Sequence, residues 1–159
     1  MEIEDLAASA EETFTVFMRE SQPRVAVALS AAFGADAARD ATAEAFAYAW
    51  EHWDRVGGMT NPAGYVYRVG HHRASKQRRT AAAVVPEPSN HDPWVEPGLV
   101  PALRRLSPRQ RTVAVLMDGY GLHSQETAQL LGMSRSSVRR HHERALRKLR
   151  SALGVTIDV

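Results

Sequence analysis

The chain has 159 residues, enough for one ordinary domain or two small helical ones. Its composition, 44% hydrophobic and 24% charged, is that of a globular protein, and the lack of cysteine excludes disulfides and thiolate metal sites. No apolar run approaches the roughly 18 residues that a membrane span requires, and the acidic start lacks the blocks of a signal peptide. We therefore expect a cytoplasmic protein without a membrane partner.

The net charge of +2 conceals a strong segregation along the chain. Residues 1–54 carry three arginines against eleven acids, whereas residues 55–79 carry five arginines and one lysine with no acid. Residues 80–98 carry three acids and no lysine or arginine, and residues 99–159 carry ten arginines and one lysine against four acids. Two basic blocks separated by an acidic segment indicate two contacts with a polyanion. A solvated helix face is the alternative for either block alone.

Apolar residues at helical spacing predict four helices in the first half of the chain. Proline, glycine and capping residues bound these helices, which we place at Ala10–Glu20, Pro23–Phe33, Ala37–Trp53 and Pro62–Arg79. Trp50 and Trp53 follow the apolar spacing of the third helix, so we expect both in the core. A glycine-rich loop follows, and Asn61 is the expected cap of the fourth helix.

The fourth helix separates an apolar side from a basic side. Val66, Val69 and Gly70 share one side. The opposite side holds a basic stripe flanked by Tyr65 and His71: Arg68, His72, Lys76 and Arg79. Basic residues interleaved with an aromatic ring suit single-stranded or distorted nucleic acid, which offers both phosphates and bases. A plain surface stripe is the alternative.

Residues 124–153 have the form of a helix-turn-helix. Ser124 is the expected N-cap of its first helix, and Gly132 follows where a left-handed residue is needed. Ser134 then caps the second helix, with its hydroxyl within reach of the amide of Ser137. Small Ala128 and β-branched Val138 stand where two such helices touch.

The last helix also has two sides. Its apolar side ties it to the domain, and the opposite side is free for a major groove. The residues of that free side are Ser136, Arg139, Arg140, Arg144 and Arg147. Shorter helices are predicted over 100–106 and 108–117, and no segment predicts a strand. The expected fold is all-α, with two small helical domains, residues 1–79 and 99–159, joined by a flexible acidic linker over 80–98.

Seven histidines raise the question of a metal site. His71 and His72, like His141 and His142, are adjacent in sequence and diverge on a helix, so neither pair can chelate alone. No metalloprotease spacing, phosphate loop, nucleophile–base pair or cofactor motif is present. We expect no metal, no cofactor and no enzyme activity.

These motifs resemble the extracytoplasmic-function (ECF) group of bacterial sigma factors over roughly residues 11–153. The stretch LRRLSPRQRTVAVLMDGYGLHSQETAQLLGMSRSSVRRHHERALRKLR is similar to region four of that family. ARDATAEAFAYAWEHWDR is similar to its polymerase-binding helix, and NPAGYVYRVGHHRASKQRR to its promoter-melting helix. Arg73 stands where the family has a buried apolar residue, and His142 replaces an apolar residue on the packing face of the last helix.

The resemblance implies a sigma factor that binds core RNA polymerase and initiates transcription at specific promoters. Residues that would contact polymerase are Asp40, Glu44 and Trp50. Residues that would recognise or melt the −10 element are Met59, Asn61, Arg68, His71, His72, Lys76 and Arg79. Residues that would read the −35 element are Arg135, Ser136, Ser137, Arg139, Arg140, His141 and Arg144. The implied partners are core polymerase and promoter DNA, with an anti-sigma factor as in many members of the family.

Two other functions remain open from the sequence. One is a sigma-like regulator that binds DNA but no longer initiates transcription. The other is an interaction protein whose first domain docks on a partner other than polymerase.

Overall fold

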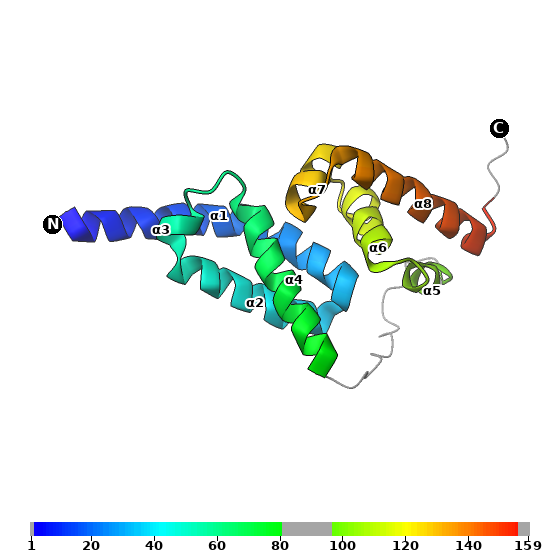
Figure 1. The fold of residues 1–159 in the computed structure, drawn as a ribbon, viewed down its shortest axis with the longest axis horizontal. Coiled ribbons are helices and arrows are strands. Elements are labelled where there is room, and N and C mark those ends of the chain that lie inside the picture. The colour runs from blue at the N-terminus through cyan, green and yellow to red at the C-terminus, as the bar shows by residue number, and fades with distance from the viewer. Residues whose placement is uncertain (1, 81–96, 156–159) are drawn as a thin grey trace.

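The computed structural model describes the backbone of residues 2–80 and 97–155 and the side chains of residues 8–78 and 97–155. Every regular element in these ranges is helical, so the all-α prediction is confirmed. The elements, labelled in Figure 1, are α1 Glu2–Phe33, α2 Ala35–Glu51, α3 Trp53–Val56, α4 Pro62–Thr80, α5 Leu99–Arg104, α6 Pro108–Ala114, the π-helix η1 Val115–Gly119, α7 Ser124–Leu131 and α8 Arg135–Leu153. The linker predicted for residues 80–98 lies almost wholly outside the described residues.

Helix α1 corrects the prediction of two helices separated at Pro23, because Pro23 lies inside one continuous helix. A proline inside a helix costs about 3 kcal/mol through a lost hydrogen bond and a steric clash. Packing on both sides of it offsets this cost. Before the proline, the Phe17 ring lies 5.0 Å from that of Trp53. After it, Val25 and Leu29 are fully buried.

The predicted cap of α4 is confirmed, and the structure also shows a cap on α6. Asn61 Oδ1 accepts a hydrogen bond from the Gly64 amide at 3.0 Å, which fixes the start of α4. Ser107 and Gln110 form a reciprocal capping box at the start of α6, with bonds of 3.2 and 3.3 Å. After Ala114 the α-helix is followed directly by the π-helix η1. Helical structure therefore extends past the predicted end at Met117.

The helix-turn-helix prediction is confirmed in α7 and α8, with one correction. Gly132 is left-handed at φ 65°, and Ser134 Oγ accepts from the Ser137 amide at 3.1 Å. The N-cap of α7, however, is His123 rather than Ser124. The reason is that the Glu126 carboxylate accepts from the His123 amide at 2.8 Å, so the helix is capped one residue earlier than Ser124 predicts.

The core of the first half lies where α1, α2 and α4 meet. Gly70 on α4 allows this close approach, because a Cβ there would lie 2.7 Å from Leu29 Cδ1. Leu29 is itself fully buried and has little room to move. We expect Gly70→Ala to lower the free energy of unfolding by about 1–3 kcal/mol through overpacking, measured by urea denaturation.

Gly58→Ala is the matched control, since a Cβ at Gly58 would meet only the Arg55 carbonyl oxygen at an ordinary 3.8 Å. An equal loss of stability in both variants would contradict the close approach at Gly70.

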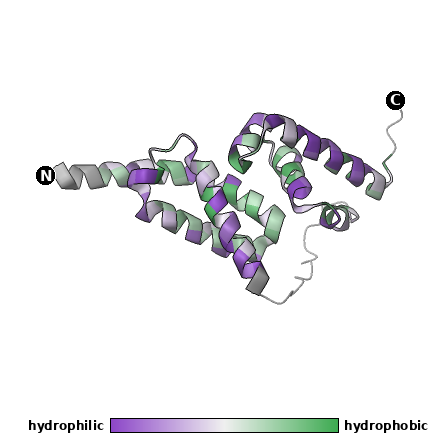
Figure 2. Ribbon diagram, in the orientation of Figure 1, coloured by the Kyte–Doolittle hydropathy of each residue, from purple (hydrophilic) through white to green (hydrophobic). Residues whose placement is uncertain are grey.

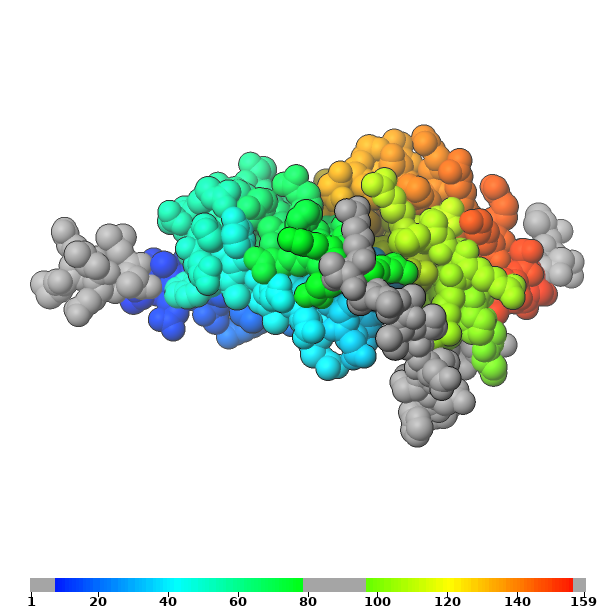
Figure 3. All heavy atoms as spheres, turned by 60° about the horizontal axis from the view of Figure 1, so that its bottom comes forward, coloured from blue at the N-terminus to red at the C-terminus, as the bar shows by residue number. Residues whose placement is uncertain are grey.

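Helices from both halves of the chain share one apolar cluster. Leu116 of η1 and Leu130 of α7 are buried in the same cluster as Leu29 of α1 and Val66 of α4. In the space-filling view the second half of the chain lies directly against the first (Figure 3). The division into domains at 1–79 and 99–159 therefore stays a prediction; below, "first domain" means α1–α4 and "second domain" means α5–α8.

Two polar contacts also join the domains. Arg111 of α6 donates to the carbonyl oxygens of Ala31 and Ala32 at the end of α1, the latter at 3.2 Å. Asn61 Nδ2 donates to the Gln129 carbonyl oxygen of α7 at 2.7 Å. The domains are thus held closed by an apolar core and by polar contacts at two separate places. Of the described helices, none has both the length and the apolar character needed to cross a membrane.

Candidate nucleic-acid interface

Helix α8 presents the basic face that its sequence predicts. Val138 and Ala145 are fully buried on its inner side. Arg139, Arg140 and Arg144 are exposed on its outer side. The hydropathy colouring shows a strongly hydrophilic helix along most of its length (Figure 2). This is the arrangement needed for a helix that lies in a major groove and contacts both bases and phosphates.

The remaining predicted residues at the start of α8 take part in local structure. Arg135 Nε donates to Ser124 Oγ of α7 at 3.1 Å. The hydroxyls of Ser136 and Ser137 lie 3.1 and 2.8 Å from that of Ser134, the N-cap. The bond from Arg135 joins the start of α8 to the start of α7, and the serine contacts lie within the cap of α8.

The two histidines of α8 point in different directions, as their adjacency predicts. His142 Nε2 lies 2.8 Å from Asp118 Oδ2 and so joins α8 to the π-helix. This contact explains why a polar residue occupies the packing face. His141 Nδ1 is buried without a hydrogen-bond partner. Burial, together with Arg109, lowers the pKa of His141.

On the first domain, a cluster of arginines and tyrosines lies beside the loop before α4. Arg55 donates to the hydroxyls of Tyr48 and Tyr65, both at 3.3 Å. The guanidinium groups of Arg55 and Arg68 lie 5.5 and 5.8 Å from the centre of the Tyr65 ring. The hydrogen bond from Arg55 lowers the pKa of Tyr65. Sequence reasoning counted Arg55 only as part of a basic block, because its tyrosine partners come from two other helices.

The other predicted −10 residues have varied surroundings. Met59 is half-buried in the loop, while His72 and Lys76 are exposed on α4. Asn61 is engaged at both ends of its amide, by Gly64 and by Gln129. His71 packs edge-on against Phe33 at 4.9 Å, and burial and Arg109 lower its pKa. The side chain of Arg79 lies outside the described residues.

The predicted polymerase-binding residues all lie on α2 but have different surroundings. Asp40 is exposed, whereas Glu44 pairs with Arg73 of α4 at 2.9 Å. That ion pair explains why an arginine replaces an apolar residue at this position. Trp50 is 44% exposed, so its prediction as a core residue is wrong. Its ring packs at a tilt against that of Phe14, with 5.0 Å between the ring centres, and borders a groove of about 710 Å³ between α1 and α2.

The structure brings residues of α4 and α8 together in one cleft of about 600 Å³, whereas Arg139, Arg140 and Arg144 of α8 are not part of its lining. We call it the interdomain cleft. Its lining comes from α1, α4 and α6, from the end of α7 and the turn after it, and from α8: Ala32, Tyr67, Arg68, His71, His72, Ser75, Pro108, Arg109, Thr112, Leu131, Gly132, Met133, Ser134, Ser137 and His141. Four predicted −10 or −35 residues besides Arg68 therefore lie within it.

Arg109 of α6 is a cleft residue that sequence reasoning missed. It lies close enough to Tyr67, His71 and His141 to lower the pKa of each, although burial raises the pKa of Tyr67 to about 12. Its position directly after Pro108 at the helix start is the available sequence signal, since a cation there opposes the helix dipole.

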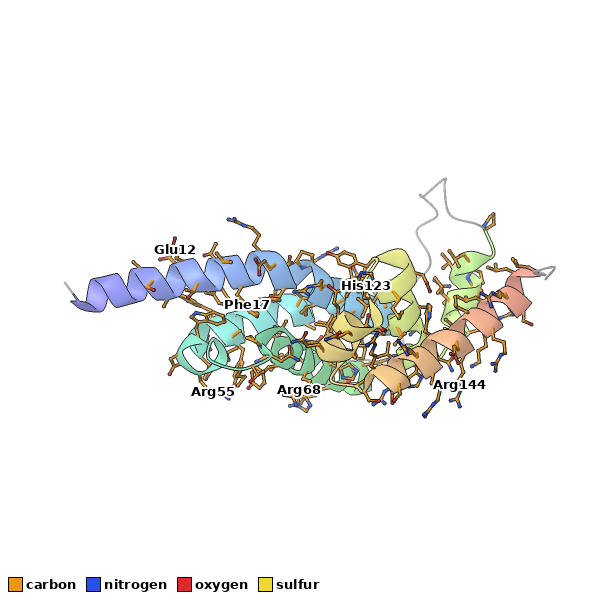
Figure 4. All side chains as sticks on the ribbon, turned by 90° about the horizontal axis from the view of Figure 1, so that it is seen from above. Glu12, Phe17, Arg55, Arg68, His123 and Arg144 are labelled. Carbon is orange, nitrogen blue, oxygen red and sulfur yellow. The ribbon has the colours of Figure 1, made fainter. Side chains whose placement is uncertain are left out.

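The exposed arginines of the two domains face the same way. Arg55, Arg68 and Arg144 lie along one edge of the molecule, and Glu12 lies on the opposite side (Figure 4). A polyanion approaching that edge would meet both basic surfaces.

Comparison with known proteins agrees with this geometry. Residues 102–151, from α5 to the end of α8, match the family model of sigma-70, region 4. Among solved structures, the chain is similar to the sigma factor RpoE of Bartonella quintana, solved in complex with the anti-sigma factor NepR. The TM-score is 0.65 at 20% identity, over 89% of this chain and 97% of the other, which shows a shared fold. A search of curated protein sequences gives no match.

Proposed function

We propose that the chain is a bacterial sigma factor of the ECF type, which reads −35 DNA with its second domain and opens −10 DNA with its first. The observation that carries this proposal is the exposed arginine face of α8 on a capped helix-turn-helix. Such a protein acts in the cytoplasm with core RNA polymerase and promoter DNA as partners. It lowers the barrier to initiation by placing polymerase at the promoter and by opening the DNA strands, and it catalyses no chemical step of its own.

The −35 contact is assigned to the middle of α8. Arg139, Arg140 and Arg144 present planar donors that suit guanine edges and phosphates. Their exposure leaves them able to enter a major groove without rearrangement of α8. The polar contacts at the start of the helix support the angle at which it would enter.

The −10 contact is assigned to the loop and α4. Tyr65 offers a ring on which an unpaired base can stack, and the guanidinium groups of Arg55 and Arg68, 5.5 and 5.8 Å from its centre, supply two cations for the phosphate. Met59 and Asn61 are on the adjacent loop and its cap. These groups favour unpaired over paired DNA, because only an unpaired base exposes its face.

Polymerase binding is assigned to the surface of α2 and the groove beside it. Asp40 and Trp50 are exposed there, and the apolar groove between α1 and α2 is open for a partner. Glu44 also lies on α2, but its carboxylate is already paired with Arg73.

The closed arrangement must open for both promoter contacts to form at once. About 25 base pairs separate −35 from −10, which corresponds to roughly 85 Å of B-form duplex at 3.4 Å per pair. In the structure, residues of α4 and of α8 line one cleft, and Asn61 is bonded to α7. Opening frees Asn61 and separates the walls of the cleft.

The proposal is tested by run-off transcription with core polymerase and a promoter library. Sequence-dependent initiation from some members is the expected result, and none from any member would overturn it. The alternative of a regulator that does not initiate is favoured by the engagement of Glu44 with Arg73. Permanganate footprinting separates the two, because the regulator would bind duplex DNA without exposing unpaired thymines.

Arg140→Ala should weaken binding of the selected −35 duplex by about 1–3 kcal/mol and relax base preference at one or two positions. Fluorescence anisotropy with the selected duplex and single-base variants measures both effects. Arg150→Ala is the matched control, since Arg150 is exposed in the last turn of the same helix. If both variants lose affinity equally and keep base preference, α8 contacts only phosphates.

A further inference from the structure

The interdomain cleft concentrates positive and potentially positive side chains from both domains. Arg68, His71 and His72 come from α4, Arg109 from α6 and His141 from α8. Among the described residues, no aspartate or glutamate lines it. A confined cleft lined by charges of one sign focuses the electrostatic potential and attracts counter-ions.

The arrangement of these groups suits one compact anion. Arg109 is close enough to His71 and His141, on opposite walls, to lower the pKa of each. The buried Nδ1 of His141 has no hydrogen-bond partner. Ser134 and Ser137, also in the lining, mark the start of α8, where the helix dipole favours negative charge, although the Ser137 amide already donates to the Ser134 hydroxyl.

We propose that the interdomain cleft binds a small phosphate-bearing anion that bridges the two domains and holds them closed. A volume of about 600 Å³ lies within the range of small-molecule sites. DNA backbone and free polyphosphate share this chemistry, and a site of this size favours the free anion. That the bound anion opposes promoter binding rests on the function proposed above, whereas its binding to the cleft does not.

Isothermal titration of the full chain with inorganic pyrophosphate tests the binding directly. A dissociation constant below about 1 mM is expected. Arg109→Gln should weaken it at least tenfold. Arg104→Gln, which removes an exposed arginine of α5 outside the cleft, should leave it within twofold.

The protonation of His71 and His141 supplies a second readout. The groups facing them are basic, apart from Tyr67, which stays neutral: Arg68, His72, Arg109, Arg140 and Arg144. Because their pKa values are lowered, both histidines are largely neutral at pH 7. A bound dianion stabilises the protonated forms, so its affinity should rise as pH falls. Sulfate, which does not titrate in this range, should bind more tightly at pH 6 than at pH 8.

Histidine ring resonances place the site. Pyrophosphate should shift those of His71 and His141 but not that of His52, which is not part of the cleft lining and hydrogen-bonds to Tyr48 O. Shifts at all three histidines, or equal losses in Arg109→Gln and Arg104→Gln, would show diffuse ion binding and overturn the proposal.

Two further outcomes would also overturn it. In the first, pyrophosphate binds only after Glu87, Asp92 and Glu96 are replaced by glutamine. That result would mean that the acidic segment, and not a free anion, occupies the cleft. The other is an equal tenfold loss of −35 duplex affinity in Arg109→Gln, which would make the cleft part of the DNA path. None of these binding measurements needs polymerase. Failure of run-off transcription would therefore leave this inference standing.

Discussion

A covalent bridge across the interdomain cleft is expected to abolish promoter opening. Ser75 of α4 and Pro108 of α6 line the cleft from opposite domains, and neither is assigned to DNA. The chain has no cysteine, so Ser75→Cys with Pro108→Cys supplies the only two thiols for a short bis-maleimide linker. The linker removes the open state, and run-off product should fall at least tenfold because only that state spans both elements.

The control for this experiment is the same double variant with each thiol capped by a monofunctional maleimide. It carries the same substitutions and similar added bulk but leaves the domains free to separate. It should initiate transcription within about threefold of the unmodified chain. Full activity of the bridged protein would show that the closed arrangement is the active one.

Leu116→Ala should both destabilise the chain and loosen the domains from each other. Leu116 is fully buried and belongs to the apolar cluster that α1, α2 and α4 form in the first domain. Removing a buried leucine side chain costs about 2–5 kcal/mol through lost transfer energy and a residual cavity. Because this cavity lies at the domain contact, fluorescence energy transfer between labels on the two domains should also fall in native buffer.

Leu106→Ala provides the matched comparison. Leu106 is 4% exposed, and its cluster contains only second-domain residues, with Ala114 and Ala145. Urea denaturation should show a loss of similar size, while energy transfer between the labels stays unchanged. If both variants alter energy transfer alike, Leu116 stabilises the second domain without joining it to the first.

Local signals predicted most of the second domain. The helix-turn-helix depends on Ser134, Gly132 and the small residue Ala128, whose effects act within a few residues of each position. The error at the cap of α7 arose because Glu126 reaches back to His123 and caps the helix one residue before Ser124.

Predictions failed where tertiary contacts outweigh local preference. Pro23 marks a helix start by its own chemistry, but packing on both sides keeps α1 continuous. Trp50 follows the apolar spacing of α2 and yet borders an open groove, since spacing alone does not say which apolar positions find a covering helix.

The candidate site was predicted in parts and not as a whole. Each basic helix face can be derived from its own periodicity. The interdomain cleft, where Arg109 of α6 lies with residues of α4 and with His141 of α8, depends on the packing of Leu116 and Leu130 against the first domain. No periodicity within a single helix encodes that contact.

The amide of Asn61 has a consequence for how opening can be observed. Its oxygen caps α4 while its nitrogen donates to α7, so one planar group belongs to a helix start and to the domain contact together. Opening breaks the second bond and leaves the first. The rate at which the two NH₂ protons of this side chain exchange with solvent therefore reports the separation of the domains. This measurement needs no label and no modification of the chain.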